Sequence, residues 1–404
     1  MIENVAIPYG CYWSSPFARW QGQLAHLHSL SFAAYAGKHA LAKRAIDPKT
    51  IDVGVLGTTI PQQGSFYGAP WLMSQLGAPQ APGPTIAQAC ATGARIMQVA
   101  ATEVSSGMAG LVLAIAADRT SNGPHVYYPA PDGPGGSGTH ENWVLDNFAR
   151  DPQTQLSMVQ TAENVAKRHG IDTAQQNDVV VRRYEQYEMA TASGGAFLKR
   201  FMDLPFAVPS ASMRKIVGTL DGDEGIHATS AAGLARLRPV LENGTVTHGG
   251  QTHPADGHAA IAVTTVKQAK ALARDPSIAV RIVAFGQSRA EPAYMPEAPV
   301  PAAQAALRTS GLKPQDMKAI KTHNPFVLND IVLARALGVD AMSFNNYGCS
   351  LVWGHPQAPT GLRAIIELIE ELAQLGGGYG LFTGCAAGDS AMAVIVHVGD
   401  GSRT

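Results

Sequence analysis

The sequence has no excess of either charge, since 30 basic side chains accompany 31 acidic ones in 404 residues. This balance argues against a general affinity for nucleic acid or anionic membranes. Long apolar runs are also missing: no stretch reaches the roughly 18 residues that a membrane-spanning helix needs, and MIENVAIPYG lacks the features of a signal peptide. With 46% hydrophobic residues, the chain can still bury a large core, so we expect a cytoplasmic globular protein.

Cysteine is scarce. Cys11, Cys90, Cys349 and Cys385 form no CxxC pair and no Cys/His cluster with the spacing of a zinc site. We therefore expect reduced thiols and no bound metal. A buried, inert thiol is the default for each, and a function has to be argued from the surrounding residues.

Two parts of the chain resemble each other. Thr92-Gly93-Ala94-Arg95 opens an apolar helical pattern, and Thr360-Gly361-Leu362-Arg363 opens a similar one 268 residues later. The segments IDPKTIDVGVLGTTIP and LKPQDMKAIKTHNP both begin with a proline-started turn and continue as an apolar strand, and Pro48 and Pro314 are 266 residues apart. Two matches at nearly equal offsets predict two similar α/β halves.

The region between the halves has a different composition. SNGPHVYYPAPDGPGGSGTH is rich in glycine and proline, and two helical patterns, TAENVAKRHG and AQQNDVVVRRYEQYEMA, follow it. We expect a first half at 1–118 that is completed by about 251–266, an inserted loop domain at 119–250, and a second half at 267–404. Such loops commonly hold ligands, although a plain surface excursion is an equal alternative.

Cys90 lies in PTIAQACATGAR, directly before the helix that Thr92 or Gly93 would start. The free N–H groups and the dipole at a helix N-terminus stabilise a thiolate and lower the pKa of the thiol. The position is therefore suited to a nucleophile. A small buried residue at a tight turn is the alternative.

His355 occupies the matching place in the second half, in NNYGCSLVWGHPQAPTGLR. If the halves pack about a pseudo-twofold axis, the starts of the two helices meet and His355 faces Cys90. Gly354 permits close backbone approach, and Pro356 keeps His355 out of the helix. A structural histidine is the alternative.

Two more polar segments follow predicted strands. Cys385 lies in the glycine-bracketed turn GLFTGCAAGDS, where a second thiol could exchange a proton with carbon. His323 and Asn324 belong to THNPF, where polar groups at a strand end could hold a substrate oxygen. A packed turn explains either segment without a function.

Four segments in fixed order, QACATGA, HNPF, GHP and GCAAG, resemble the thiolase superfamily. TAENVAKRHGID and the long segment LARLRPVLENGTVTHGGQTHPADGHAAIAVTT are also similar to family segments, so the resemblance covers essentially the whole chain. It implies a duplicated five-layer αβαβα core with an inserted loop domain that binds coenzyme A. It also implies a reaction between acyl-CoA thioesters, with coenzyme A as co-substrate and no permanent cofactor.

The resemblance assigns roles to individual residues. Cys90 would be the acyl-accepting nucleophile, His355 would take its proton and later help to hold a thioester oxygen, and Cys385 would move the proton on the α-carbon. Thr252 falls where the family often has a serine near the pantetheine arm of coenzyme A. Gly354 would support the oxyanion site.

One segment departs from the family pattern. Many thiolases have NEAF where this chain has HNPF, which is closer to the HDCF of the sterol-carrier-protein type. His323 then stands where an asparagine would position a water or bind the thioester oxygen, and Asn324 replaces an acidic residue. His248, His253 and His258 lie in a segment that is usually small and apolar, which suggests an altered pocket or partner surface.

The expected reaction is coenzyme A-dependent cleavage of a 3-oxoacyl-CoA, or the reverse Claisen condensation. A ketosynthase-like condensing enzyme and a non-catalytic thiolase-fold subunit are the alternatives. Resemblance to the benzoylsuccinyl-CoA thiolases implies an aromatic or branched acyl substrate and a small zinc-binding OB-fold partner subunit. We further expect a homodimer or a dimer of dimers.

Overall fold

The computed structural model describes residues 3–401, and within them one mixed sheet runs through both halves of the chain. Its strands follow the order β13-β14-β15-β12-β1-β11-β6-β4-β5, and β2 and β3 also pair with β11. The strands of the first half are β1 (Val5–Ile7), β2 (Tyr12–Ser14), β3 (Ala18–Arg19), β4 (Val53–Gly57), β5 (Thr85–Ile86), β6 (Leu111–Arg119) and β11 (Ala255–Thr265). Those of the second half are β12 (Ile278–Arg289), β13 (Met317–His323), β14 (Gly378–Ala386) and β15 (Ser390–Asp400).

The two halves repeat one pairing pattern. β4 is parallel to β6, which is antiparallel to β11; in the same way β13 is parallel to β14, which is antiparallel to β15. A proline-started 3-10 turn precedes the first strand of each set, at Pro48–Thr50 and at Pro314–Asp316. The predicted duplication is confirmed. β1 joins the halves, because Ala6 pairs with Thr264 of β11 on one side and with Arg281 of β12 on the other.

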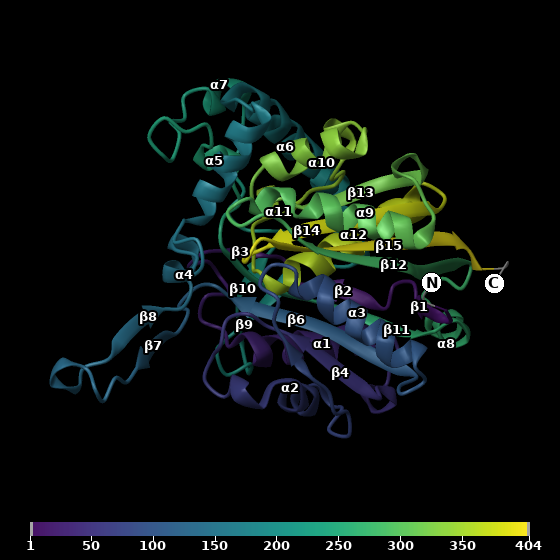
Figure 1. Ribbon diagram of the computed structural model, residues 1–404. Coiled ribbons are helices and arrows are strands. Elements are labelled where there is room, and N and C mark those ends of the chain that lie inside the picture. The colour runs from purple at the N-terminus through teal and green to yellow at the C-terminus, as the bar shows by residue number, and fades with distance from the viewer. Residues whose placement is uncertain (1–2, 402–404) are drawn as a thin grey trace.

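Helices cover both outer faces and also fill the space between the halves. The outer helices are α1 (Ser29–Lys43) and α2 (Gly68–Leu76) on the first half, and α9 (Pro299–Ser310) and α10 (Leu328–Leu337) on the second. Between the halves lie α3 (Thr92–Ser105) and α12 (Ala358–Gln374), which pack against strands of both (Figure 1). The predicted five layers, αβαβα, are confirmed.

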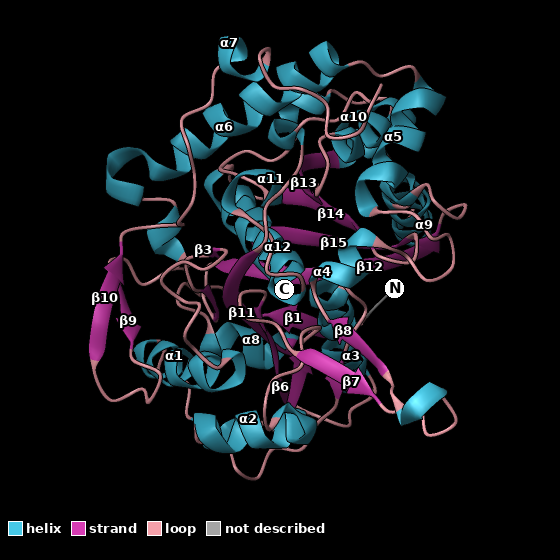
Figure 2. Ribbon diagram, turned by 90° about the vertical axis from the view of Figure 1, so that its left-hand side faces the viewer, coloured by secondary structure: helices cyan, strands magenta, loops and turns pink. Residues whose placement is uncertain are grey.

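The region from 119 to 250 lies mostly outside these layers. It contains the hairpin β7 (His125–Tyr128) and β8 (Thr139–Asn142), the hairpin β9 (Phe206–Pro209) and β10 (Ile216–Leu220), and the helices α4 (Leu145–Ala149), α5 (Met158–His169), α6 (Thr173–Gly195) and α7 (Ala231–Leu234). Both views place α5, α6 and α7 at the end of the molecule opposite α1 and α2 (Figure 1, Figure 2). α5 and α6 confirm the two predicted helical patterns, whereas the exact domain boundaries stay a prediction.

Two short helices complete the fold, α8 (Val266–Leu272) and α11 (Ser350–Trp353). Within residues 3–401, every helix is too short or too polar to cross a membrane.

α12 is almost entirely buried although it carries charged residues. Arg363, Glu367 and Glu370 have no exposed surface, and each has an opposite charge within reach. Glu370 also accepts hydrogen bonds from the hydroxyls of Tyr9 and Tyr12 at 2.9 and 2.7 Å. A buried charge is tolerated only with such partners, so these contacts keep α12 in the middle layer.

Two glycines let α3 and α12 cross with their backbones in contact. A Cβ atom added at Gly93 would lie 2.6 Å from the Leu362 nitrogen and 2.8 Å from the Ala358 oxygen. A Cβ added at Gly361 would lie 3.2 Å from the Ala94 nitrogen. Gly93 and Gly361 are the equivalent residues of the two repeated TG segments, so the duplication itself supplies this close approach.

We expect Gly93→Ala to destabilise the protein more than Gly361→Ala. The added methyl of Gly93→Ala meets backbone atoms that no side-chain rotation can move, and overpacking of this kind costs about 1–3 kcal/mol. This exceeds the up to ~1 kcal/mol that alanine gains over glycine inside a helix. The measurement is the free energy of unfolding of both variants in urea. Equal stability of Gly93→Ala and the wild type would show that the helices separate without cost.

Candidate active site

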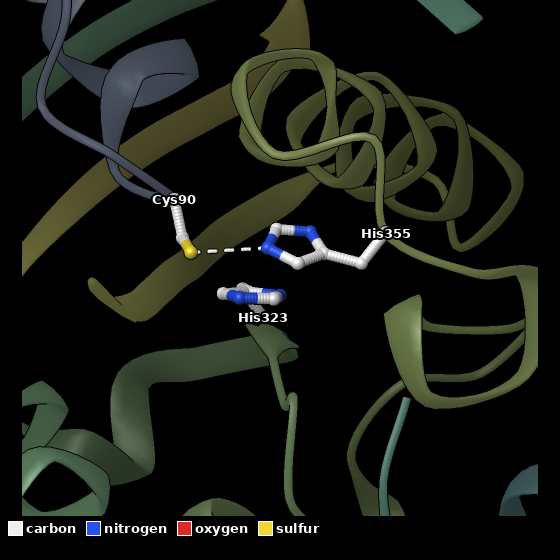
Figure 3. Close-up of side chains that lie close together, drawn as sticks. All are labelled: Cys90, His323 and His355. Carbon is white, nitrogen blue, oxygen red and sulfur yellow. Dashed lines mark hydrogen bonds between the residues drawn. The ribbon is translucent and has the colours of Figure 1, made fainter. Parts of the chain in front are cut away.

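The starts of the two central helices bring a thiol and an imidazole together. Cys90 Sγ lies 3.0 Å from His355 Nε2, although the residues are 265 positions apart (Figure 3). Cys90 precedes α3 and His355 precedes α12, as the pseudo-twofold arrangement predicted. The geometry is that of a nucleophile hydrogen-bonded to a base.

A strained turn presents Cys90. Ala89 has a φ of 42°, which is unusual for a residue with a Cβ atom. Thr92 stabilises this turn, because its hydroxyl accepts a hydrogen bond from Gln88 N at 2.8 Å and donates one to the Ala89 oxygen at 2.6 Å.

The His355 ring is fixed on its other side. Its Nδ1 lies 2.7 Å from Thr360 Oγ1, and its backbone N–H donates to the His253 oxygen at 2.9 Å. Gly354 has a φ of +89°, and a Cβ there would lie 2.8 Å from both Ala255 Cβ and His253 Nε2. Only glycine fits this position, so the turn directs Nε2 of His355 toward the sulfur.

Burial keeps both members of the pair neutral. It raises the pKa of the Cys90 thiol to about 12, against the effect of the Ala387 and Cys90 backbone N–H groups. Burial, with a smaller effect from His253, lowers the pKa of His355 to about 3. We expected the helix N-terminus to lower the thiol pKa. Desolvation outweighs that effect, because the neighbouring groups are neutral imidazoles and, within residues 3–401, no cationic side chain lies beside the sulfur.

His323 packs beneath this pair, with its ring centroid 4.1 Å from that of His355 and the planes 30° apart (Figure 3). Its Nδ1 lies 2.8 Å from Ser350 Oγ, which already accepts from Asn324 N and donates to Asn324 Oδ1, each at 3.1 Å. A hydroxyl has one hydrogen, so Nδ1 of His323 must be the donor and the neutral ring leaves a lone pair on Nε2. Burial lowers the pKa of His323 well below its ordinary value.

This assignment changes the expectation for the HNPF segment. In its neutral form His323 offers an acceptor, not the donor that an oxyanion needs. The Asn324 amide is fully used, because Nδ2 donates to Asp330 Oδ2 at 2.8 Å and Oδ1 accepts from Ser350 and from Leu351 N. Asn324 therefore orients Ser350 and, through it, His323.

Cys385 completes the group of sequence-derived candidates. It is fully buried on β14, and Asn329 Nδ2 donates to its sulfur at 3.3 Å. Burial raises the pKa of the Cys385 thiol strongly, and the nearby Cys90 raises it further. Cys385 is thus a protonated thiol close to Cys90. Asn329 follows HNPF on α10, and sequence reasoning missed it.

A second residue that sequence reasoning missed is Asp118 at the end of β6. Its buried carboxylate accepts hydrogen bonds from the Thr59 N–H and hydroxyl, both at 2.8 Å, and from Ala358 N at 2.9 Å. Burial raises its pKa to about 6, opposed by these hydrogen bonds. Through these hydrogen bonds Asp118 connects the first half to the N-terminus of α12, which begins shortly after His355. A lone aspartate at a strand end gave no signal of this role.

Cys90 and His355 open into a cavity of about 280 Å³. Most of its wall is apolar, and Thr252 belongs to it, with its hydroxyl donating to the Ser350 oxygen at 2.5 Å. The apolar lining includes Phe148, Met158, Val159, Met295, Pro325 and Phe326.

The three histidines of the 248–258 segment lie in different environments. His248 is exposed and His258 is buried in β11 beside Phe32, with ring centroids 5.0 Å apart. His253 alone touches the site, through the Gly354–His355 turn.

Comparisons with known proteins agree with this geometry. The models of the thiolase N-terminal domain and the thiolase C-terminal domain match residues 13–267 and 276–398. An acetyl-CoA acetyltransferase of Allochromatium vinosum is 28% identical, over 98% of this chain and 100% of its own, and a beta-ketothiolase of Cupriavidus necator is 28% identical over 93% and 94%. The structure of human mitochondrial 3-ketoacyl-CoA thiolase in complex with CoA superposes with a TM-score of 0.87, at 25% identity and 98% coverage of both chains.

We expect Thr360→Val to slow the reaction of Cys90 with iodoacetamide roughly five- to tenfold, because a lost hydrogen bond of about 1 kcal/mol no longer holds the His355 ring in place to accept the thiol proton. Thr360→Ser keeps the hydroxyl and should react like the wild type. The rate is followed by mass spectrometry of the Cys90 peptide. Equal rates in the wild type and Thr360→Val would mean that Thr360 has no part in orienting His355.

Proposed function

The chain belongs to the thiolase family and is an acyltransferase, and we propose that it cleaves a 3-oxoacyl-CoA, or runs the reverse condensation, through an acyl-Cys90 intermediate. The observation that carries this proposal is the 3.0 Å contact of Cys90 with His355 at the wall of an apolar cavity. Cys385, a second thiol nearby, supplies the group that a carbon–carbon cleavage needs and a simple thioester hydrolysis does not.

In the cleavage direction, Cys90 Sγ attacks the 3-keto carbon while its proton passes to His355 Nε2. The bond between C2 and C3 then breaks. The electron pair on C2 takes a proton from the Cys385 thiol, which burial keeps protonated. The products of this half-reaction are acyl-Cys90, which keeps the carbons from C3 onward, and the acyl-CoA that keeps C1 and C2.

In the second half-reaction the thiol of coenzyme A attacks acyl-Cys90 and its proton returns Cys385 to the thiol form. The Cys90 sulfur leaves and recovers its proton from His355. While protonated, His355 can donate through Nε2 to the thioester oxygen, because its Nδ1 proton is held by Thr360. Neutral His323 has a lone pair on Nε2 that can accept a hydrogen bond, so we assign to it the positioning of a water.

We assign coenzyme A to the cavity side that the inserted region forms. Ser157 and Met158, at the start of α5, and Thr252 line the same cavity as Cys90. Thr252 would lie beside the pantetheine arm. The inserted domain at 119–250 would bind the rest of the coenzyme A molecule.

The acyl group is proposed to be bulky, aromatic or branched, as in benzoylsuccinyl-CoA. Phe148, Met158, Met295 and Phe326 form apolar walls with little polar surface to satisfy, which favours an apolar group of this kind. A zinc-binding OB-fold partner, a homodimer or dimer of dimers, and a cytoplasmic location stay predictions.

The mechanism predicts that replacing the two thiols has different effects. Mixed with an acyl-CoA, the wild type should gain one acyl group on Cys90, which mass spectrometry detects, and Cys90→Ala should gain none. Cys385→Ala should still acylate but lose cleavage of 3-oxoacyl-CoA by at least about a hundredfold. Cys11→Ser is the control, because Cys11 lies in another core cluster and bonds to the Leu272 oxygen.

The outcomes separate the rival functions. No adduct on the wild type would favour a non-catalytic subunit. Full cleavage by Cys385→Ala would contradict the role of the second thiol, and condensation that does not depend on Cys385 would favour a ketosynthase-like enzyme.

The acyl preference is tested with a panel of 3-oxoacyl-CoAs assayed for coenzyme A-dependent cleavage. A phenyl-bearing substrate should have a kcat/KM at least about tenfold above that of acetoacetyl-CoA, because burying a ring contributes more than 1.4 kcal/mol. The same assay, run with and without any co-purified protein, tests whether cleavage requires a partner subunit. A preference for acetoacetyl-CoA would overturn the bulky-substrate proposal.

A further inference from the structure

Three side chains at the candidate active site carry metal-binding atoms that point into a common space. Cys90, His323 and His355 each offer one such atom, and these atoms lie within 4.8 Å of one another. A tetrahedral zinc site with bonds of about 2.0–2.3 Å needs ligand atoms roughly 3.3–3.7 Å apart. Small rotations of the imidazole rings would therefore bring the three atoms to the distances that zinc requires.

The hydrogen bonds that fix the two imidazole rings all use Nδ1, which leaves Nε2 of each ring to face the site. His355 uses Nδ1 for Thr360, and His323 uses Nδ1 for Ser350, so both rings present Nε2. His323 Nε2 has no hydrogen-bond partner among the described residues although His323 is only 1% exposed. Metal-binding imidazoles usually have their other nitrogen fixed in this way, which sets the tautomer and the ring orientation.

We propose that Cys90, His323 and His355 form a site for Zn²⁺ that reversibly inhibits the enzyme. Two imidazole nitrogens and one thiolate are a typical zinc ligand set, and the fourth position faces the cavity, where water or an added thiol can bind. Binding forms a Zn–S bond and releases the Cys90 proton to solvent. The sulfur is then unavailable for acylation.

His323 distinguishes this site from the Cys90–His355 pair alone. The pair supplies two ligands, whereas three protein ligands are usual for a zinc site that keeps an open position. The HNPF segment therefore does more than alter the oxyanion region, because it adds the third ligand. Zinc binding by these side chains does not depend on the acyl-transfer activity proposed above.

Cobalt(II) tests the ligand set directly. Titrating the metal-free full-length protein with Co²⁺ should produce a thiolate-to-cobalt charge-transfer band and the visible bands of tetrahedral Co²⁺, and Zn²⁺ should abolish both. Cys90→Ser should lose the charge-transfer band. Cys385→Ser should keep it, because Cys385 is outside the ligand group. A missing band in the wild type, or a band that survives in Cys90→Ser, would refute the site.

His323→Asn tests the third ligand. We expect the zinc dissociation constant, measured by competition with a chromogenic chelator, to rise at least about tenfold. An unchanged constant in a variant whose circular dichroism and thermal unfolding match the wild type would overturn the proposal.

A measurement on the wild type alone needs no folded variant. Zn²⁺ should protect Cys90 from iodoacetamide, as seen by mass spectrometry, and a chelator should restore the reaction. Alkylation of Cys90 at the same rate with and without Zn²⁺ would count against the site even if acyl transfer is confirmed.

Discussion

The backbone contact between Gly93 and Gly361 determines the geometry of the site. Because neither residue has a side chain, α3 and α12 approach closely enough for the turns before them to meet. Cys90 lies three residues before the first glycine and His355 six before the second, so both ends of the 3.0 Å pair are set by this crossing. A larger residue at either position would separate the two turns before it disturbed any polar contact.

The site operates with neutral side chains that are largely buried. Hydroxyls of Thr360 and Ser350, not carboxylates, hold the two imidazoles, so no charge fixes either ring in its protonated form. The nearby carboxylate of Asp118 is engaged with the backbone and threonines of the first half and with the start of α12. Proton transfer between Cys90 and His355 therefore accompanies attack on a substrate, because an ion pair would be costly at rest.

The sequence predicted the fold and the central pair because the duplication is visible in the chain. The duplication matches Thr92 with Thr360, but the two threonines have different roles in the structure. Thr92 stabilises the turn at Cys90, and Thr360 orients the ring of His355. The ionisation of Cys90 was predicted wrongly, since a helix N-terminus can be recognised from local sequence but desolvation depends on distant segments. The burial of Glu370 could not be predicted either, because a charged residue in an amphipathic helical pattern normally faces solvent.

A buried ion pair connects the inserted region to α12, the helix that follows His355. The guanidinium of Arg363 on α12 lies over the rings of Phe17 and Trp353, 4.7 and 4.4 Å from their centroids, and donates two hydrogen bonds to Asp223 at 2.5 and 2.7 Å. Asp223 belongs to the region from 119 to 250. Without it the two terminal nitrogens of the buried Arg363 guanidinium would lose their carboxylate partner, while Nε would still pair with Glu367, and the loss of a buried charge partner is strongly unfavourable. α12 also begins directly after His355. The segment that shapes the cavity therefore stabilises the helix that carries the base, and substitutions in the insertion can alter the site without contacting substrate.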